Sequence, residues 1–118
     1  MPQRASSARF AERVLQGVDD VGGDERVVIW IERRAGALWG VGRVVNPQHR
    51  PSDQSRPDDY VFEGYELEDA LEHANEALED EVRVLEQDGR GTGPHVLPFT
   101  RDELLKPLES WFFGHRAG

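Results

Sequence analysis

Residues 66–88 alternate between apolar and acidic positions with the period of one long helix. Apolar side chains recur there at steps of three and four residues, which places them on a single stripe of an α-helix. The stripe consists of Leu67, Leu71, Ala74, Leu78, Val82 and Leu85. The pattern predicts an amphipathic helix of about 21 residues, roughly 32 Å long, that crosses the whole domain.

Two shorter patterns predict helices near the ends of the chain. Ser6 or Ser7 can cap a short N-terminal helix that ends at Gly17. Its buried face would consist of Phe10, Val14 and Leu15. In the C-terminal region, Thr100 and Glu103 stand at capping-box spacing, so a second short helix is expected to begin near residue 101.

A β-branched run and a glycine-containing turn predict a β-hairpin between these helices. Residues 27–31 form the apolar run, residues 34–36 the three-residue turn, and residues 38–45 the returning strand. This register pairs Trp30 with Gly40. Gly40 and Gly42 would then form a flat strip on which the indole of Trp30 can lie.

The period of two divides the hairpin into two apolar faces. One face carries Val27, Ile29, Ile31, Trp39, Val41 and Val45, with Arg33 and Arg43 near its ends. The other carries Val28, Trp30, Leu38, Gly40, Gly42 and Val44. Such a sheet must be covered on both sides. The long helix can cover one side, which leaves the terminal helices, a second subunit or a flat ligand for the other.

The remaining segments complete the predicted fold. Residues 46–59 contain three prolines and no aliphatic side chain, so we expect a mobile loop there. Residues 60–65 alternate as a further strand that leads directly into the long helix. We therefore expect residues 1–118 to form one α+β domain. Its sheet would have three or four mainly antiparallel strands, with the long acidic helix packed across it and short helices at both ends.

Charge is concentrated in the long helix. The chain of 118 residues has a formal net charge of −9, and residues 66–88 alone hold ten carboxylates against one arginine. Such a chain disfavours tight nonspecific binding to duplex phosphates, which requires clustered cations. No apolar run is long enough to span a bilayer or to resemble a signal peptide, so we expect a cytoplasmic protein without membrane contacts.

The residues that carry most catalytic chemistry do not form a convincing site. There is no cysteine, which excludes disulfides and thiol nucleophiles. Asp69, His73 and Glu76 would share one helix face, but two turns without a ligand from another element do not close a metal site. We therefore expect no enzyme activity, no metal and no cofactor.

The hairpin and the long helix carry opposite charges. Four arginines against Glu32 give the hairpin a charge of +3. Both surfaces can be ordinary solvated faces. Our preferred interpretation is a small binding or regulatory protein that acts through protein contacts, with Glu72, Glu76 and Glu79 facing a basic partner. We also expect a homodimer whose interface includes the face with Trp30 or residues 111–113.

The alternative is a module that binds single-stranded nucleic acid through the hairpin face. Bases would stack on aromatic side chains while arginines contact the phosphates. The residues that would form this surface are Trp30, Tyr60, Phe62, Arg26, Arg34 and Arg43.

Overall fold

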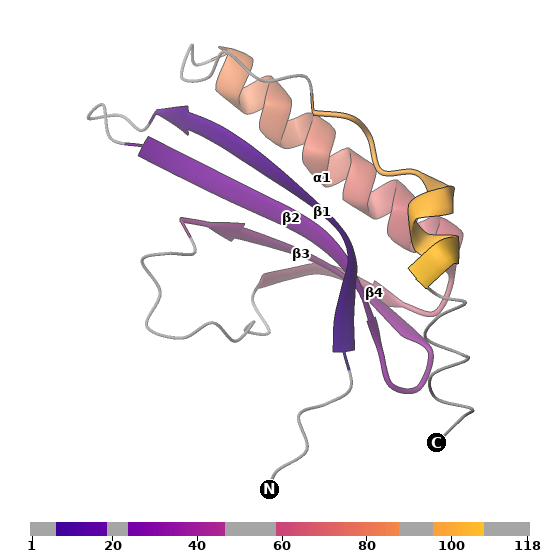
Figure 1. The fold of residues 1–118 in the computed structure, drawn as a ribbon. Coiled ribbons are helices and arrows are strands. Elements are labelled where there is room, and N and C mark those ends of the chain that lie inside the picture. The colour runs from indigo at the N-terminus through magenta and orange to yellow at the C-terminus, as the bar shows by residue number, and fades with distance from the viewer. Residues whose placement is uncertain (1–6, 19–23, 47–58, 88–95, 108–118) are drawn as a thin grey trace, which may run out of the picture.

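The computed structural model describes residues 7–18, 24–46, 59–87 and 96–107. Its elements in chain order are β1 (Ser7–Val18), β2 (Asp24–Arg34), β3 (Leu38–Val45), β4 (Tyr60–Gly64) and α1 (Leu67–Gln87). The strands form one antiparallel sheet in the order β1-β2-β3-β4. The helix α1 lies across one face of the sheet, and a short helix over residues 101–107 lies on the same side (Figure 1). The α+β prediction is confirmed.

The expected N-terminal helix is wrong, because these residues form the 12-residue strand β1. From Ala11 to Gly17 the side chains alternate between buried or half-buried and exposed positions, which is the period of a strand. Arg13 occupies one of the inward positions. Because a charged residue at an inward position breaks the alternation of apolar and polar residues in the sequence, the period of the strand is not recognisable there. Phe10, Val14 and Leu15 therefore do not share one buried face: Leu15 is buried and Val14 is exposed.

The β2–β3 hairpin is confirmed, but its predicted register is shifted by two residues. Residues 35–37 form the turn, with Gly36 at φ 81° and Ala37 at φ 63°. Trp30 consequently pairs with Gly42 rather than Gly40. A shift of two residues moves no side chain to the other face of a strand, so the predicted division of the hairpin into two faces holds.

The main core lies between the sheet and α1. β2 and β3 contribute Val27, Ile29, Ile31, Trp39 and Val41, while α1 contributes Ala70, Ala74, Leu78 and Leu85. Ala11 and Leu15 from β1, together with Phe99 and Leu104 from the C-terminal region, complete it. The stripe that marks α1 in the sequence thus faces the sheet as expected. The opposite side of the sheet, called here the distal face, has a smaller core of Val28, Trp30 and Val44, with Tyr60 packed against it.

Two irregularities in the strand pairing decide which side chains reach each face. The β1–β2 register shifts between Arg9 and Ala11, and the β3–β4 register shifts between Val41 and Gly42. In the second shift, Tyr60 pairs with Gly42 and Phe62 pairs with Val41. An extra residue in one strand changes the face of the side chains that follow. Tyr60 therefore packs on the distal face, and Phe62 packs against the core beneath α1.

The C-terminal helix begins as its capping box predicts. The backbone N–H and the hydroxyl of Thr100 donate to Glu103 Oε1 at 2.9 and 3.1 Å. Most of the predicted mobile loop, residues 47–58, lies outside the described residues, as do residues 111–113. The described ranges contain no helix with both the length and the hydrophobicity that a bilayer-spanning segment needs.

Candidate functional site

A buried carboxylate organises the polar side chains of the distal face. Glu32 is 5% exposed. Its Oε1 accepts hydrogen bonds from Trp30 Nε1 at 2.6 Å and from the Tyr60 hydroxyl at 3.0 Å. Its Oε2 accepts from Arg34 Nε at 2.7 Å. Three donors from two strands therefore satisfy this carboxylate, as burial of a charged group requires.

Arg34 joins this network to the edge of the sheet. Its Nη1 donates to Glu63, and its guanidinium lies 4.1 Å from the centroid of the Tyr60 ring. Burial acts to lower the pKa of Arg34, but hydrogen bonds to Glu32, Tyr60 and Glu63 outweigh it and raise that pKa above its ordinary value. Arg34 is thus a cation that is already paired within the chain.

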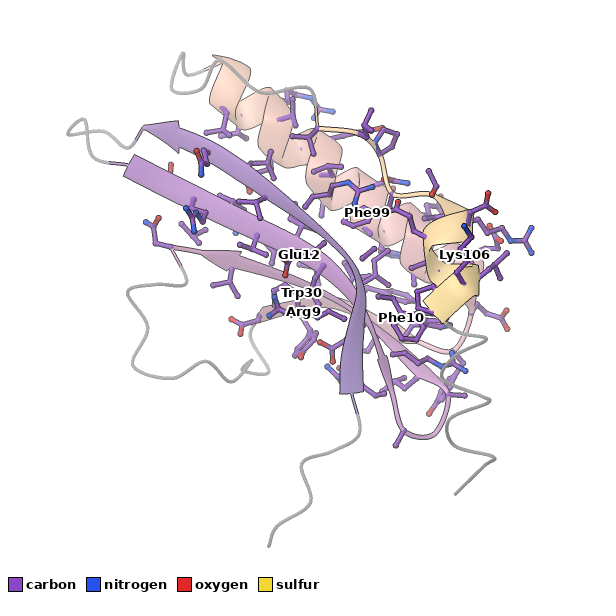
Figure 2. All side chains as sticks on the ribbon, in the orientation of Figure 1. Arg9, Phe10, Glu12, Trp30, Phe99 and Lys106 are labelled. Atoms are coloured by element: carbon purple, nitrogen blue, oxygen red, sulfur yellow. The ribbon has the colours of Figure 1, made fainter. Side chains whose placement is uncertain are left out.

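Trp30 is enclosed by the same face. Its side chain is completely buried. Arg9 lies beside Trp30 (Figure 2). The Arg9 guanidinium is 4.0 Å from the indole centroid, and Tyr60 packs edge-on with its ring centroid at 5.9 Å. Arg9 is held in turn by Glu12 at 2.7 Å. A nucleobase would have to displace these neighbours before it could stack on Trp30.

The six residues proposed for the nucleic-acid alternative do not share one surface. The structure brings together Trp30, Tyr60 and Arg34 on the distal face. Phe62 lies on the α1 side and stacks on His73 of the helix at 4.3 Å between centroids. Arg43 reaches α1, where its Nε lies 2.6 Å from Glu81 Oε1. Arg26 is exposed near the other end of β2, and its backbone N–H donates to Asn46 Oδ1.

The positive charge of the hairpin is therefore divided between the two faces. Arg33 is buried on the α1 side, 4.6 Å from the centroid of Trp39, and its Nε has no hydrogen-bond partner in the described part of the chain. Burial lowers the pKa of Arg33. Arg43 neutralises Glu81 on the same side. The sequence count of +3 thus does not describe an exposed basic patch.

The outward face of α1 presents six exposed carboxylates. They are Glu68, Asp69, Glu72, Glu76, Glu79 and Asp80. Arg101 pairs with Glu68 at 3.0 Å, and Arg83 pairs with Asp80 at 3.2 Å. No ion pair or hydrogen bond joins the side chains of Glu72, Glu76 and Glu79 to another described residue. These three carboxylates are called here the acidic stripe. They are the residues that the sequence analysis predicts to face a basic partner.

The carboxylates of α1 do not gather into a metal site among the residues that the structure describes. His73, the one imidazole on α1, has its Nδ1 2.8 Å from the carbonyl oxygen of Asp69. Its ring is also stacked on Phe62. His73 is therefore engaged by its own helix and by β4 rather than turned toward the neighbouring acids.

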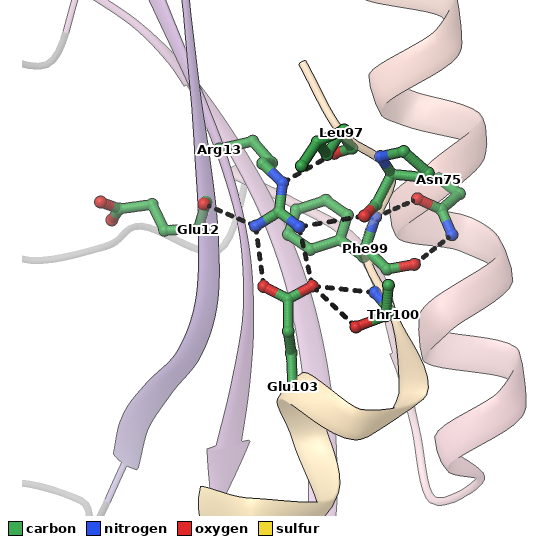
Figure 3. Close-up of polar contacts among 8 residues, drawn as sticks. Glu12, Arg13, Asn75, Leu97, Phe99, Thr100 and Glu103 are labelled. Atoms are coloured by element: carbon green, nitrogen blue, oxygen red, sulfur yellow. Dashed lines mark hydrogen bonds and ion pairs between the residues drawn. The ribbon is translucent and has the colours of Figure 1, made fainter. Parts of the chain in front are cut away.

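The segment before the C-terminal helix is clamped between β1 and α1 (Figure 3). Arg13 donates to the carbonyls of Leu97 and Pro98 and forms a two-point ion pair with Glu103, at 2.7 and 3.0 Å. On the other side, the Asn75 side chain bonds both the N–H and the carbonyl of Phe99. The hydrogen bond from Arg13 is the main cause that lowers the pKa of Glu103.

A groove opens between α1 and the clamped segment. It is an open groove with a volume of about 370 Å³, and its apolar lining comes from Leu78, Val82, Val96 and Pro98. Asn75, Glu79 and Arg83 supply the polar lining. Sequence reasoning missed this groove, because the contact between Arg13 and residues 97–103 joins positions more than 80 apart. The one local signal was the capping box at Thr100.

Comparison with protein-family models, with curated proteins and with solved structures finds no match for this chain. The site must therefore be interpreted from its own geometry.

Proposed function

We propose that this protein is a binding or regulatory module that recognises a basic segment of another protein through the acidic stripe on α1. The observation that carries the proposal is that Glu72, Glu76 and Glu79 are exposed. None of the three forms an ion pair with a cation among the described residues. Their spacing of four and three residues places them on one side of the helix. Such a surface attracts a cationic partner and accelerates encounter with it.

The support of α1 suits this role. The helix is anchored to the sheet along its apolar stripe, and the ion pair between Arg43 and Glu81 fastens its inner face to β3. The acidic stripe is therefore displayed on a helix whose position is set by the core. A preorganised surface loses less conformational entropy on binding than a flexible one.

The nucleic-acid alternative receives less support from the same geometry. Trp30 is fully buried, Arg34 is paired with two carboxylates, and Phe62 lies on the opposite side of the sheet. Stacking proteins need accessible aromatic faces beside free cations. Moreover, the exposed carboxylates of α1 repel phosphate.

The proposal is tested by comparing two variants that lose the same charge. The stripe variant carries Glu72→Gln, Glu76→Gln and Glu79→Gln. The control variant carries Glu12→Gln, Glu66→Gln and Asp102→Asn, three exposed positions off the stripe. Affinity for a Lys- and Arg-rich synthetic peptide is measured by fluorescence anisotropy. We expect the stripe variant to bind about tenfold more weakly, since each exposed pair contributes up to about 1 kcal/mol.

The control variant should bind nearly as well as the wild type. Equal losses in the two variants would show that the peptide responds to net charge alone, and the acidic stripe would then not be the binding site.

A further inference from the structure

The groove beside α1 and the acidic stripe share one residue. Asn75, Leu78, Glu79, Val82 and Arg83 line the groove and lie at helical spacing on one side of α1. Glu79 also belongs to the acidic stripe, which runs along the adjacent strip of the helix surface. A single bound segment can therefore contact both features.

The floor of the groove is suited to an apolar side chain. Its apolar lining consists of the buried Leu78 together with Val82, Val96 and Pro98. Asn75 offers little hydrogen-bonding capacity, because both its amide nitrogen and its carbonyl oxygen already bond Phe99. A volume of about 370 Å³ can accommodate a bulky hydrophobic side chain.

The charges around the groove indicate what accompanies that side chain. Arg83 is the basic residue of the lining, and it is already paired with Asp80. Glu79 has no such partner among the described residues. The acidic stripe beside the groove therefore carries a net negative charge. This charge favours a ligand whose apolar side chain is flanked by cations over one flanked by acids.

We propose that the groove receives one large apolar side chain from the same basic segment whose Lys or Arg side chains lie on the acidic stripe. This inference rests on the proposed function and specifies its partner: a protein segment with an aliphatic or aromatic anchor next to basic residues. The anchor supplies the buried contact, while the cations supply orientation and a faster encounter.

Selection from a displayed library of random peptides tests this inference with the full chain as the target. Peptides that bind should share basic residues and one large apolar residue at a constant spacing from them. In a synthetic copy of a selected peptide, changing the apolar residue to Ser should weaken binding to the wild type by roughly tenfold or more. Against the Val82→Gln variant, the same change should have little further effect.

The Val84→Gln variant is the matched control, since Val84 is exposed on α1 and does not line the groove. It should respond to the peptide change as the wild type does, and thermal unfolding checks that both variants fold. If the loss of the anchor weakens wild type and Val82→Gln equally, the anchor does not occupy the groove and the inference is wrong. If the selected peptides are basic but share no apolar residue, the groove assignment is wrong, while the proposed role of the acidic stripe is still supported. If the selected peptides share no basic residues, both proposals are wrong.

Discussion

Trp30 on β2 and Gly42 on β3 form a cross-strand pair in which the indole occupies the space that a side chain at position 42 would need. A Cβ atom placed on Gly42 would lie 2.1 Å from Cζ2 of Trp30 and 2.4 Å from two further ring atoms. Real Cβ atoms do not approach other atoms so closely. The burial of Trp30 on the distal face therefore depends on glycine at position 42.

This pair predicts a large effect for Gly42→Ala. The added methyl group must push the indole out of its place, and overpacking of this kind costs about 1–3 kcal/mol. Gly40→Ala is the matched control, because a Cβ atom at position 40 would come no closer than 3.2 Å to its nearest neighbour, Cγ of Glu32. Urea unfolding should show a clear loss for Gly42→Ala and a smaller one for Gly40→Ala. Equal losses would contradict the packing of Trp30 against residue 42.

Replacement of Glu32 by Gln tests the buried network. Glu32→Gln removes the charge that pairs with Arg34 and exchanges one acceptor for a donor beside Trp30 and Tyr60. We expect a loss of stability on the order of 2 kcal/mol. Glu63→Gln, which removes the exposed partner of Arg34, should cost less than about 1 kcal/mol. Urea unfolding measures both losses of stability. If Glu63→Gln destabilises the protein more than Glu32→Gln, the buried carboxylate is not the more important partner of Arg34.

The lowered pKa of Glu103 predicts a pH dependence for the clamp on the C-terminal segment. Ionised Glu103 bonds Arg13 in the folded protein, so its contribution is present above the ordinary glutamate pKa of about 4.3. That contribution is lost as the pH falls through the lowered pKa. Glu103→Gln should therefore be less stable than wild type at neutral pH, and the difference should shrink in acid. A difference that stays constant with pH would show that the ion pair with Arg13 does not stabilise the fold.

The regular parts of this fold could be predicted from single segments of sequence. The bounds of α1, the two faces of the β2–β3 hairpin and the Thr100 cap each depend on neighbouring residues with a clear period. The strand β1 could not be predicted in this way, because its inward Arg13 is explained by contacts with residues 97–103, which lie more than 80 positions away in the sequence. Local periodicity contains no information about such a partner.

The predicted nucleic-acid-binding surface is wrong for a similar reason, because it assumed a regular strand over Tyr60 and Phe62. Tyr60 and Phe62 have the spacing of side chains on one face of a regular strand. The register shift opposite Val41 and Gly42 places them on opposite faces instead. In contrast, the exposure of the acidic stripe could be predicted, because an amphipathic helix that buries its apolar side must present the other to solvent.

Self-association remains a prediction. The residues expected to need a partner on the distal face, Val28, Trp30 and Val44, are buried within one chain. The C-terminal aromatic residues 111–113, which lie outside the described residues, are now the preferred contact. Light scattering at tens of micromolar protein should give twice the mass of one chain. A monomeric mass would show that the homodimer was wrongly inferred.

The central claim is that α1 binds a basic protein segment and that the distal face does not bind nucleic acid. The most direct measurement is a parallel titration of the wild-type protein with a basic peptide and with single-stranded DNA in ~150 mM salt. The peptide should bind with an affinity that falls as salt is raised, and the DNA should not bind. Submicromolar binding of the DNA, weakened by Trp30→Ala or Tyr60→Ala, would identify the hairpin as the site and show that the proposed function is wrong.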